Sequence, residues 1–203
     1  MDPIPPFYDD LEATLHFAWA QLERGAADRR SPLNTPALAT RTTDGAPRVR
    51  TVILRGVDAG DRVLTVFTDA RSAKIGAIHS DPRVALHAYH PRQRFQLRIA
   101  GVARIHTGDE VARAAWSRVR GQSRLNYLGA APGSAAPGPS GGGAERFTAS
   151  APSPEDLDEA FRRFAVLRIR VDALEWLYLH AAGNRRAAFR WTPAGPQAGW
   201  LHP

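Results

Sequence analysis

The chain contains no cysteine, which excludes disulfide bonds, thiolate metal ligands and cysteine nucleophiles. No apolar run reaches membrane-spanning length, and the acidic, proline-rich start of the sequence lacks the apolar segment of a signal peptide. We therefore expect a cytoplasmic protein that does not contact membranes. A chain of 203 residues can bury a hydrophobic core of its own, so we expect one domain over residues 1–203.

The signatures of several common catalytic sites are also missing. The sequence has no GxGxxG run after a strand and no GxxxxGKS or GxxxxGKT run, so the usual nucleotide-binding loops are unsupported. It has no GxSxG elbow for a serine nucleophile. The histidines show no HExxH or other ligand spacing, so we predict no metal site.

Positive charge is present in excess. The net charge is +7 at pH 7, and Lys74 is the only lysine among 27 lysine and arginine residues. The cations are spread over the whole length rather than gathered in a basic block, which favours an arginine-rich surface over nucleic-acid binding. A second interpretation is that some arginines cluster in the fold and hold a small anionic ligand.

The hydrophobic periodicity predicts a mainly β protein with a few helices at its periphery. Apolar residues at three- and four-residue spacing predict a helix over 7–24, which Gly25 ends. From residue 37 the period changes to two, and residues 36–69 are expected to form three strands. Further helices are expected at 72–80, 109–119 and 154–164, and further strands at 83–89, 94–106, 165–171, 175–180, 186–191 and around Trp200.

Strands in hairpin order indicate an antiparallel sheet, and six or more of them usually close into a barrel. Residues 129–153 are rich in Gly, Pro, Ala and Ser. Such a segment buries little apolar area to offset its ordering entropy, so we expect a mobile low-complexity loop there.

The stretch 67-FTDARSAK-74 joins a predicted strand to a predicted helix. The free backbone N–H groups of a helix start favour an anion. Together with the side chains of Arg71, Ser72 and Lys74 they would bind a phosphate dianion. The compact ammonium of a lysine fits a tight niche that a planar guanidinium does not. The alternative is a solvated first helical turn with one incidental lysine.

Two other segments bear on this site. The predicted strand 48-RVRTVILRG-56 pairs with the strand that ends at Thr68, and it carries Arg50 and Arg55 on opposite faces. On this hypothesis one arginine joins the phosphate and the other points elsewhere along the ligand. Gln96, among apolar residues of the strand 94–105, is either a sheet-surface residue or an amide that faces the edge of a heteroaromatic ring.

The order of these motifs resembles the pyridoxamine 5'-phosphate oxidase family of FMN-binding split barrels, over about residues 35–203. The motifs that carry the resemblance are 50-RTVILR-55, 67-FTDARSAK-74, 81-DPRVAL-86, 95-FQLRIAGVARI-105, 174-LEWLYL-179, 185-RRAAF-189 and 199-GWLHP-203. The resemblance implies an antiparallel split β-barrel that forms a homodimer. It also implies two FMN molecules at the subunit interface, with residues from both chains in each site.

The resemblance assigns roles to individual residues. The FMN phosphate would be held by Arg50, Arg71, Ser72 and Lys74. Other cofactor contacts would come from Thr51, Val52, Ile53, Leu54, Arg55, Phe67, Thr68, Gln96 and Arg186. Arg118, Ser123 and Arg185 would contact the substrate. For Arg185 and Arg186 the alternative is a solvated hairpin turn after Gly183 and Asn184.

The function implied is two-electron transfer between bound FMN and a small, anionic or planar substrate. The sequence departs from the oxidase itself at four points. Leu177 follows Glu175 and Trp176 where the oxidase has a tryptophan. Ala73 precedes Lys74 where the oxidase has arginine, Ala114 stands near a tyrosine position, and no histidine follows Arg185. These departures leave the substrate open. The alternatives are a non-catalytic flavin-binding protein of the same fold and a basic β-barrel that binds nucleic acid.

Overall fold

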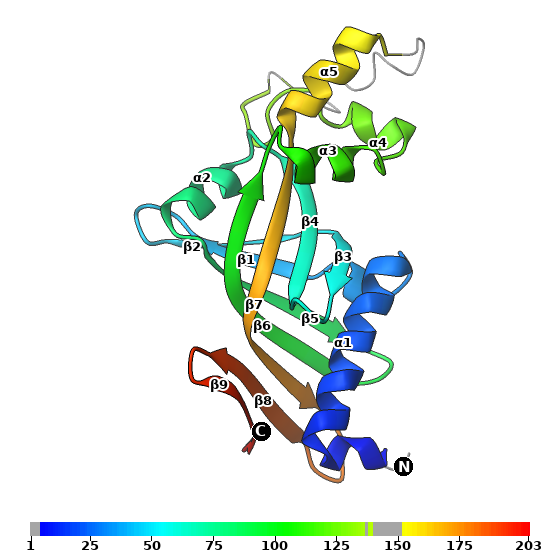
Figure 1. Cartoon of the computed structure of the whole chain (residues 1–203), viewed down its shortest axis with the longest axis vertical. Coiled ribbons are helices and arrows are strands. Elements are labelled where there is room, and N and C mark those ends of the chain that lie inside the picture. The colour runs from blue at the N-terminus through cyan, green and yellow to red at the C-terminus, as the bar shows by residue number, and fades with distance from the viewer. Residues whose placement is uncertain (1–4, 137, 140–151) are drawn as a thin grey trace.

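The computed structural model describes residues 5–136, 138–139 and 152–203. Its centre is one antiparallel sheet in which the strands follow the order β2-β1-β5-β6-β7-β4-β3, with β8 paired to β7 and β9 paired to β8 (Figure 1). The strands are β1 (Ala37–Arg41), β2 (Pro47–Thr51), β3 (Leu54–Asp58), β4 (Val63–Asp69), β5 (Arg83–His90), β6 (Phe95–His106), β7 (Phe164–Tyr178), β8 (Arg185–Thr192) and β9 (Gly195–Leu201).

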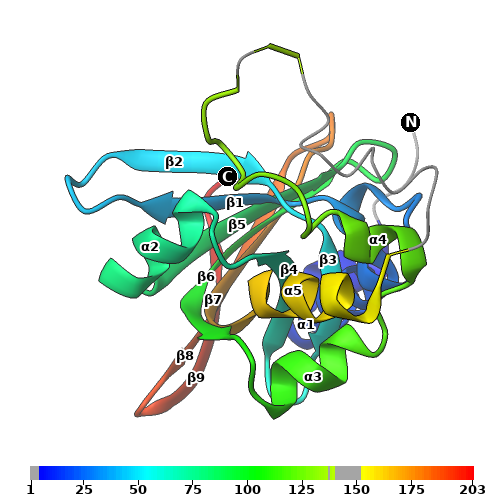
Figure 2. The same cartoon turned by 90° about the horizontal axis from the view of Figure 1, so that it is seen from above.

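Helices surround the sheet at its periphery. They are α1 (Leu11–Ala27), α2 (Ala73–Ser80), α3 (Glu110–Trp116), α4 (Gly121–Leu125) and α5 (Pro154–Arg163), with short 3₁₀ turns η1 (Pro6–Asp9) and η2 (Pro32–Asn34). Helices α2 to α5 gather at one end of the molecule, whereas α1 runs along the other part of the sheet (Figures 1 and 2). The mainly β, antiparallel fold with peripheral helices is therefore confirmed. Within the described residues no pairing joins β2 to β3, so closure of the sheet into a barrel stays a prediction.

The first helix is shifted from its expected bounds. It begins at Leu11 because the side chain of Asp10 accepts a hydrogen bond from the N–H of Ala13. It also continues through Gly25, which the sequence predicts as its end. A Cβ on Gly25 would lie 2.9 Å from the Cβ of Leu33, so glycine lets η2 pack directly against the helix. The buried face of α1 carries Ala18, Trp19 and Leu22.

The segment 48–55 forms two strands rather than one, so the prediction of three strands over 36–69 is wrong. The N–H of Val52 donates to the carbonyl of Pro36 at 3.0 Å, and the side chain of Val52 turns into the core. The chain leaves β2 at this point and enters β3. As a result β2 pairs with β1, and only β3 pairs with β4, with Leu54 opposite Val66.

By contrast, the two strands predicted at 165–171 and 175–180 form the single strand β7. Its register against β6 is interrupted between Ala100 and Gly101, where Asp172 is an extra residue on β7. From residue 167 to 171 the buried residues are odd-numbered, and from 174 to 178 they are even-numbered, which is why the sequence pattern looks like two strands. A Cβ on Gly101 would lie 2.1 Å from the carbonyl oxygen of Arg170, so the close approach of the two main chains at this register shift requires glycine.

Other expectations agree with the structure. The hairpins β5-β6 and β8-β9 form where the sequence predicts them. Helix α5 begins with a capping box between Ser153 and Asp156, and Pro154 occupies its first turn. The expected low-complexity loop 129–153 lies partly outside the described residues. None of the described helices is both long and apolar enough to span a membrane.

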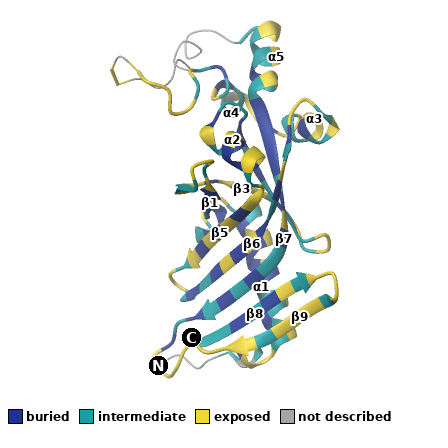
Figure 3. Ribbon diagram, turned by 90° about the vertical axis from the view of Figure 1, so that its left-hand side faces the viewer, coloured by how far each residue is buried: buried dark blue, intermediate teal, exposed yellow. Residues whose placement is uncertain are grey.

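The hydrophobic core lies between the sheet and α1. Its largest fully buried side chains include Phe95 of β6 and Trp176 of β7. Figure 3 shows this burial along β6 and β7, whereas β9 is largely exposed. A second cluster forms where α3 packs beside the end of β7, around Ala112, Val119, Phe164 and Val166. The helical end of the sheet therefore has its own packed support.

Candidate functional site

Three polar side chains meet between the end of β4 and the start of α2. The ammonium Nζ of Lys74 donates to Thr68 Oγ1 and to Ser72 Oγ, each at 2.9 Å. The two hydroxyl oxygens are 3.4 Å apart. Ser72 is the N-cap residue of α2, but its hydroxyl makes no capping hydrogen bond and faces the ammonium instead. We call Thr68, Ser72 and Lys74 the lysine cluster.

Positive charge accumulates at the lysine cluster. Burial and the nearby guanidinium of Arg50 both lower the pKa of Lys74, and Asp69 opposes this shift. The guanidinium of Arg50 donates from Nη1 to the hydroxyl of Thr40 at 2.8 Å and to the carbonyl of Leu38 at 3.2 Å. The sheet therefore positions Arg50 through β1, not through the predicted pairing with β4.

The adjacent Arg71 has a different set of partners. Its Nε and Nη2 donate to the two carboxylate oxygens of Asp69, at 3.0 and 2.7 Å. Nη1 donates to the carbonyl of Gly129 at 3.1 Å, and Nη2 lies 3.4 Å from the carbonyl of Tyr127. Arg71 thus ties the end of β4 to the segment after α4. Among the described residues its partners are Asp69, Tyr127 and Gly129, which lie outside the lysine cluster.

A second arginine holds the same segment. Arg163, the last residue of α5, donates from Nη1 to the carbonyls of Tyr127, Leu128 and Gly129 at 3.2–3.3 Å. Its Nη2 forms an ion pair of 2.6 Å with Glu159. Two guanidinium groups therefore fix the main chain at 127–129, which carries Tyr127 into the neighbouring cavity.

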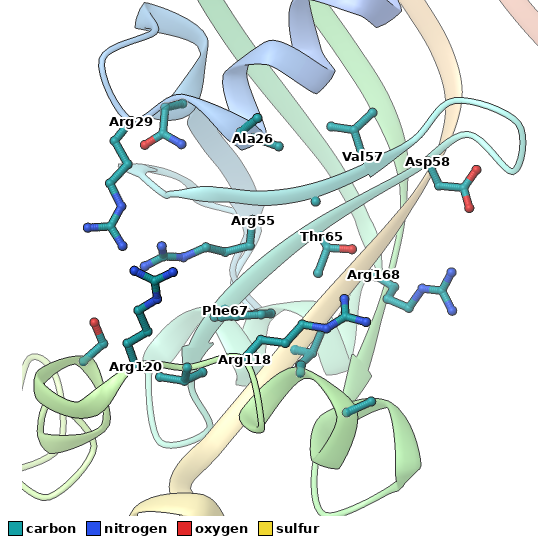
Figure 4. Close-up of a pocket in the computed structure, with 18 of the residues that line it drawn as sticks. Ala26, Arg29, Arg55, Val57, Asp58, Thr65, Phe67, Arg118, Arg120 and Arg168 are labelled. Carbon is teal, nitrogen blue, oxygen red and sulfur yellow. The ribbon is translucent and has the colours of Figure 1, made fainter.

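That cavity has a volume of about 1090 Å³ and lies on the other side of the end of β4. Side chains alternate along a strand, so Thr68 belongs to the lysine cluster while Phe67 and Thr65 line the cavity. Six arginines line it, so we call it the arginine cavity, and Figure 4 labels five of them. These five are Arg29 after α1, Arg55 on β3, Arg118 and Arg120 between α3 and α4, and Arg168 on β7.

The walls of the arginine cavity combine these cations with apolar and hydroxyl groups. Arg55 lies over the ring of Phe67, 5.8 Å from its centroid. Burial raises the pKa of Tyr127 to about 12, so its phenol stays protonated. Ser123 and Ala114, which the sequence places in the substrate region, also line the cavity. Arg30, at the rim, is paired with Asp28.

The structure brings some predicted site residues together and separates others. Arg50 lies close to the lysine cluster, whereas Arg55, Phe67, Arg118 and Ser123 share the arginine cavity. The side chains of Val52 and Leu54 are buried in the core, and those of Thr51 and Ile53 are exposed.

Three predicted residues lie elsewhere within this chain. Gln96 contacts His87 at 3.0 Å near the β5-β6 turn, and α2 lies at the opposite end of β5. Arg186 forms an ion pair of 2.6 Å with Glu175, and Arg185 pairs with Asp9. One copy of the chain therefore does not bring these side chains to Lys74.

Sequence reasoning missed several residues of the arginine cavity. Arg29, Arg120, Arg168 and Tyr127 come from four separate segments, and no local pattern distinguishes them from surface residues. Arg120 stands two positions after Arg118, which is the one available signal. Among the described residues no group of three His, Asp or Glu side chains could hold a metal ion.

Solved structures share this arrangement of elements. A pyridoxamine 5'-phosphate oxidase-related, FMN binding protein from Nostoc punctiforme PCC 73102 is 23% identical, with a TM-score of 0.76 over 100% of both chains. PhzG from Burkholderia lata 383 is 20% identical, with a TM-score of 0.75 over 100% of this chain and 99% of that one. The chain therefore has the fold of the pyridoxamine 5'-phosphate oxidase-related proteins.

Sequence comparison gives a match to one protein family over part of the chain. Residues 16–107 match the family described as pyridoxamine 5'-phosphate oxidase, FMN-binding domain. Over these residues the chain is similar to that family, which confirms the resemblance carried by its motifs. The matched part includes the lysine cluster and both Arg50 and Arg55, whereas Arg118, Arg120 and Arg168 of the arginine cavity lie beyond it.

The similarity to curated relatives is partial. The pyridoxine/pyridoxamine 5'-phosphate oxidase of Erythrobacter litoralis (strain HTCC2594) is 39% identical over 105 residues, which is 50% of this chain and 47% of the relative. The enzyme of the same name from Gluconobacter oxydans (strain 621H) is 36% identical over 97 residues, 48% of this chain and 46% of the relative. The chain thus spans about half the length of the curated relatives it matches.

Proposed function

We propose that this protein is an FMN-binding oxidoreductase that transfers two electrons between the flavin and a small anionic substrate in the arginine cavity. The observation that carries the proposal is the lysine cluster, which lies within the part of the chain that matches an FMN-binding domain. Bound FMN would supply the redox chemistry, and the protein would supply binding, orientation and electrostatics.

The lysine cluster suits a phosphate. An ammonium has three N–H donors, and two of them face hydroxyl groups that are donors in their own right. The N–H groups at the start of α2 add further donors. Asp69, the acid beside Lys74, is paired with Arg71, so this lysine has no carboxylate partner within the described residues. A dianionic phosphate would meet only donors here and would stabilise the charged form of Lys74.

The arginine cavity suits the second reactant. Its guanidinium groups favour an anion, and Phe67, Val57 and Val166 give it an apolar wall. The neutral phenol of Tyr127 adds a hydroxyl that can donate a hydrogen bond. Both sites lie at the end of β4, one on each side of the strand. A cofactor at the lysine cluster and a substrate in the arginine cavity would therefore be neighbours at this strand end.

A second copy of the chain would complete the cofactor site. Gln96 and Arg186, which the family resemblance assigns to FMN, lie far from Lys74 within one chain. The outer face of the sheet nearby carries a shallow apolar groove that includes Ala37, Ala39 and the 67% exposed Val49. We therefore propose a homodimer in which this face contacts its copy and the partner's β6 and β8 approach the flavin.

The direct test is the spectrum and flavin affinity of the purified protein. A flavoprotein absorbs from about 350 to 500 nm. We expect FMN to bind and its fluorescence to change on titration, while light scattering gives the mass of a dimer. A colourless protein that binds oligonucleotides with a steep salt dependence would instead support the nucleic-acid alternative.

A kinetic test separates an enzyme from a non-catalytic flavin-binding protein. Stopped-flow measurements would follow the reduction of bound FMN by nicotinamide and amine donors, with free FMN as the reference. Reduction faster than that of free FMN supports the oxidoreductase. No acceleration with any donor, together with tight FMN binding, would leave only the flavin-binding role.

A further inference from the structure

Five arginines of the cavity form two sets on opposite walls. The guanidinium groups of Arg29, Arg55 and Arg120 point toward one another at one side of the cavity, whereas Arg118 and Arg168 extend toward the other side (Figure 4). The first set comes from the segment after α1, from β3 and from the α3–α4 connection, and the second comes from the α3–α4 connection and β7. Phe67 and Thr65 lie between the two sets on β4.

Both sets lack counter-charges. Within the described residues none of these five guanidinium groups forms a hydrogen bond or an ion pair, whereas that of Arg30, which also lines the cavity, does. The acids of the cavity are directed elsewhere. Asp28 pairs with Arg30, and Asp58 accepts the N–H of Asp61 and lies away from Arg29 and Arg55, on the side of Arg168, with which it forms no ion pair in the described part of the chain (Figure 4).

Within the first set, the positive charge of one arginine affects the pKa of another. Burial and the positive charge of Arg29 lower the pKa of Arg55. A carboxylate or phosphate placed among these guanidinium groups would remove that repulsion and accept several hydrogen bonds. A single small anion at the first set would leave Arg118 and Arg168 on the other wall without an anionic partner.

The size of the cavity allows one molecule to reach both walls. Its volume of about 1090 Å³ is at the upper end of the range for small-molecule sites. Phe67 lies between the two sets, and Val57 and Val166 add apolar surface to the lining, which suits an apolar or aromatic body. The cavity therefore offers charge at its two sides and apolar surface between them.

We propose that the substrate is a dianion: a flat apolar body that lies against Phe67, with one anionic group bound by Arg29, Arg55 and Arg120 and the other by Arg118 and Arg168. This inference rests on the proposed function, since it specifies the substrate class of the same site. It goes further in that it requires two separated anionic groups rather than one.

Pairs of carboxylic acids that share a ring system but differ by one carboxylate test this substrate proposal directly. Isothermal titration calorimetry on the FMN-saturated protein would compare terephthalate with benzoate, and biphenyl-4,4'-dicarboxylate with biphenyl-4-carboxylate. We expect at least one diacid to bind about fivefold more tightly than its monoacid, the effect of one further partly solvated charge pair. Higher salt should reduce this advantage.

Substitutions locate the two anionic groups. Arg29→Gln and Arg168→Gln should each bring the affinity of the diacid to within about twofold of that of the monoacid, because each removes one end of the site. Arg190→Gln is the matched control, since Arg190 is exposed on β8 and does not line the cavity. It should leave both affinities unchanged.

Three results would overturn the inference: no diacid exceeds its monoacid, Arg190→Gln has the same effect as the cavity variants, or FMN and the diacid compete for one site. Flavin binding is measured separately by absorbance. If FMN does not bind but the diacid preference and its loss in both variants are observed, the oxidoreductase proposal fails and the two-anion site stands.

Discussion

The guanidinium of Arg71 holds the carboxylate of Asp69 through two parallel hydrogen bonds, of 3.0 and 2.7 Å. Asp69 is 7% exposed and lies beside the lysine cluster. Without this pair, its negative charge would face Lys74 and compete with an incoming phosphate. The arginine that precedes Ser72 thus supports the anion site by neutralising an acid, and it need not touch the phosphate itself.

We predict that Arg71→Gln lowers the free energy of unfolding by about 2–3 kcal/mol, because it leaves a nearly buried carboxylate without its partner. Urea unfolding would measure this. The double variant Asp69→Asn, Arg71→Gln should recover part of the loss, since it removes the unpaired charge. Equal destabilisation in the single and double variants would show that the lost contacts to Tyr127 and Gly129 dominate instead.

For Lys74→Ala we predict weaker FMN binding by about 1.5–3 kcal/mol, which is roughly a 10- to 150-fold rise in the dissociation constant. Fluorescence titration would measure it. Lys74→Arg keeps the charge but should not restore affinity, because the larger planar group does not fit between Thr68 and Ser72. The Arg190→Ala variant serves as a control. An unchanged dissociation constant in Lys74→Ala would refute the role of Lys74.

The lowered pKa of Lys74 predicts a pH dependence on the alkaline side. Since a bound phosphate favours the protonated ammonium, FMN affinity should fall as pH rises through the lowered pKa of Lys74, before the ordinary pKa of lysine is reached. In the FMN-free protein the sign for stability is opposite. The unfolded chain keeps its proton up to the ordinary pKa, so stability should rise with pH in the window between the lowered and the ordinary value.

The Lys74→Ala variant provides the control for both trends. Its FMN affinity should be flat over the same alkaline window, and its stability should lack the rise. Titrations of wild-type and variant protein at matched ionic strength would compare them. Parallel pH profiles for the two proteins would show that another group titrates.

At the β6-β7 crossing we predict that Gly101→Ala destabilises the fold by about 3 kcal/mol, the upper range for an overpacked core. The new methyl group would lie 2.1 Å from the main-chain oxygen of Arg170, and a backbone atom cannot move aside as a side chain can. Thermal unfolding would show the loss. Gly76→Ala is the control, because a Cβ there meets no atom within 4 Å.

Much of the fold could be predicted from the sequence because alternation and turn residues act locally. The hairpin β5-β6 and the capped helix α5 are examples. The break between β2 and β3 could not be predicted, because no glycine or proline marks it. It depends on Val52, which bonds to Pro36 and enters the core, and that contact exists only after the strands have assembled.

The candidate site shows the same limit. The residues of 67-FTDARSAK-74 are close in sequence, so their convergence at a helix start could be predicted from the motif. The pairing of Arg71 with Asp69 could not, because it depends on how the turn bends and on the distant carbonyl of Gly129. The arginine cavity is assembled from α1, β3, β7 and the α3–α4 connection, and no local pattern records such a meeting.

The extra residue in β7 has a consequence for how this strand serves two parts of the molecule. Arg168 and Trp176 are an even number of positions apart, and on an uninterrupted strand they would share a face. Because Asp172 shifts the alternation, Arg168 lines the charged cavity while Trp176 is fully buried. If this one position were deleted, either the guanidinium of Arg168 would lie in the core or the indole of Trp176 would be exposed to water.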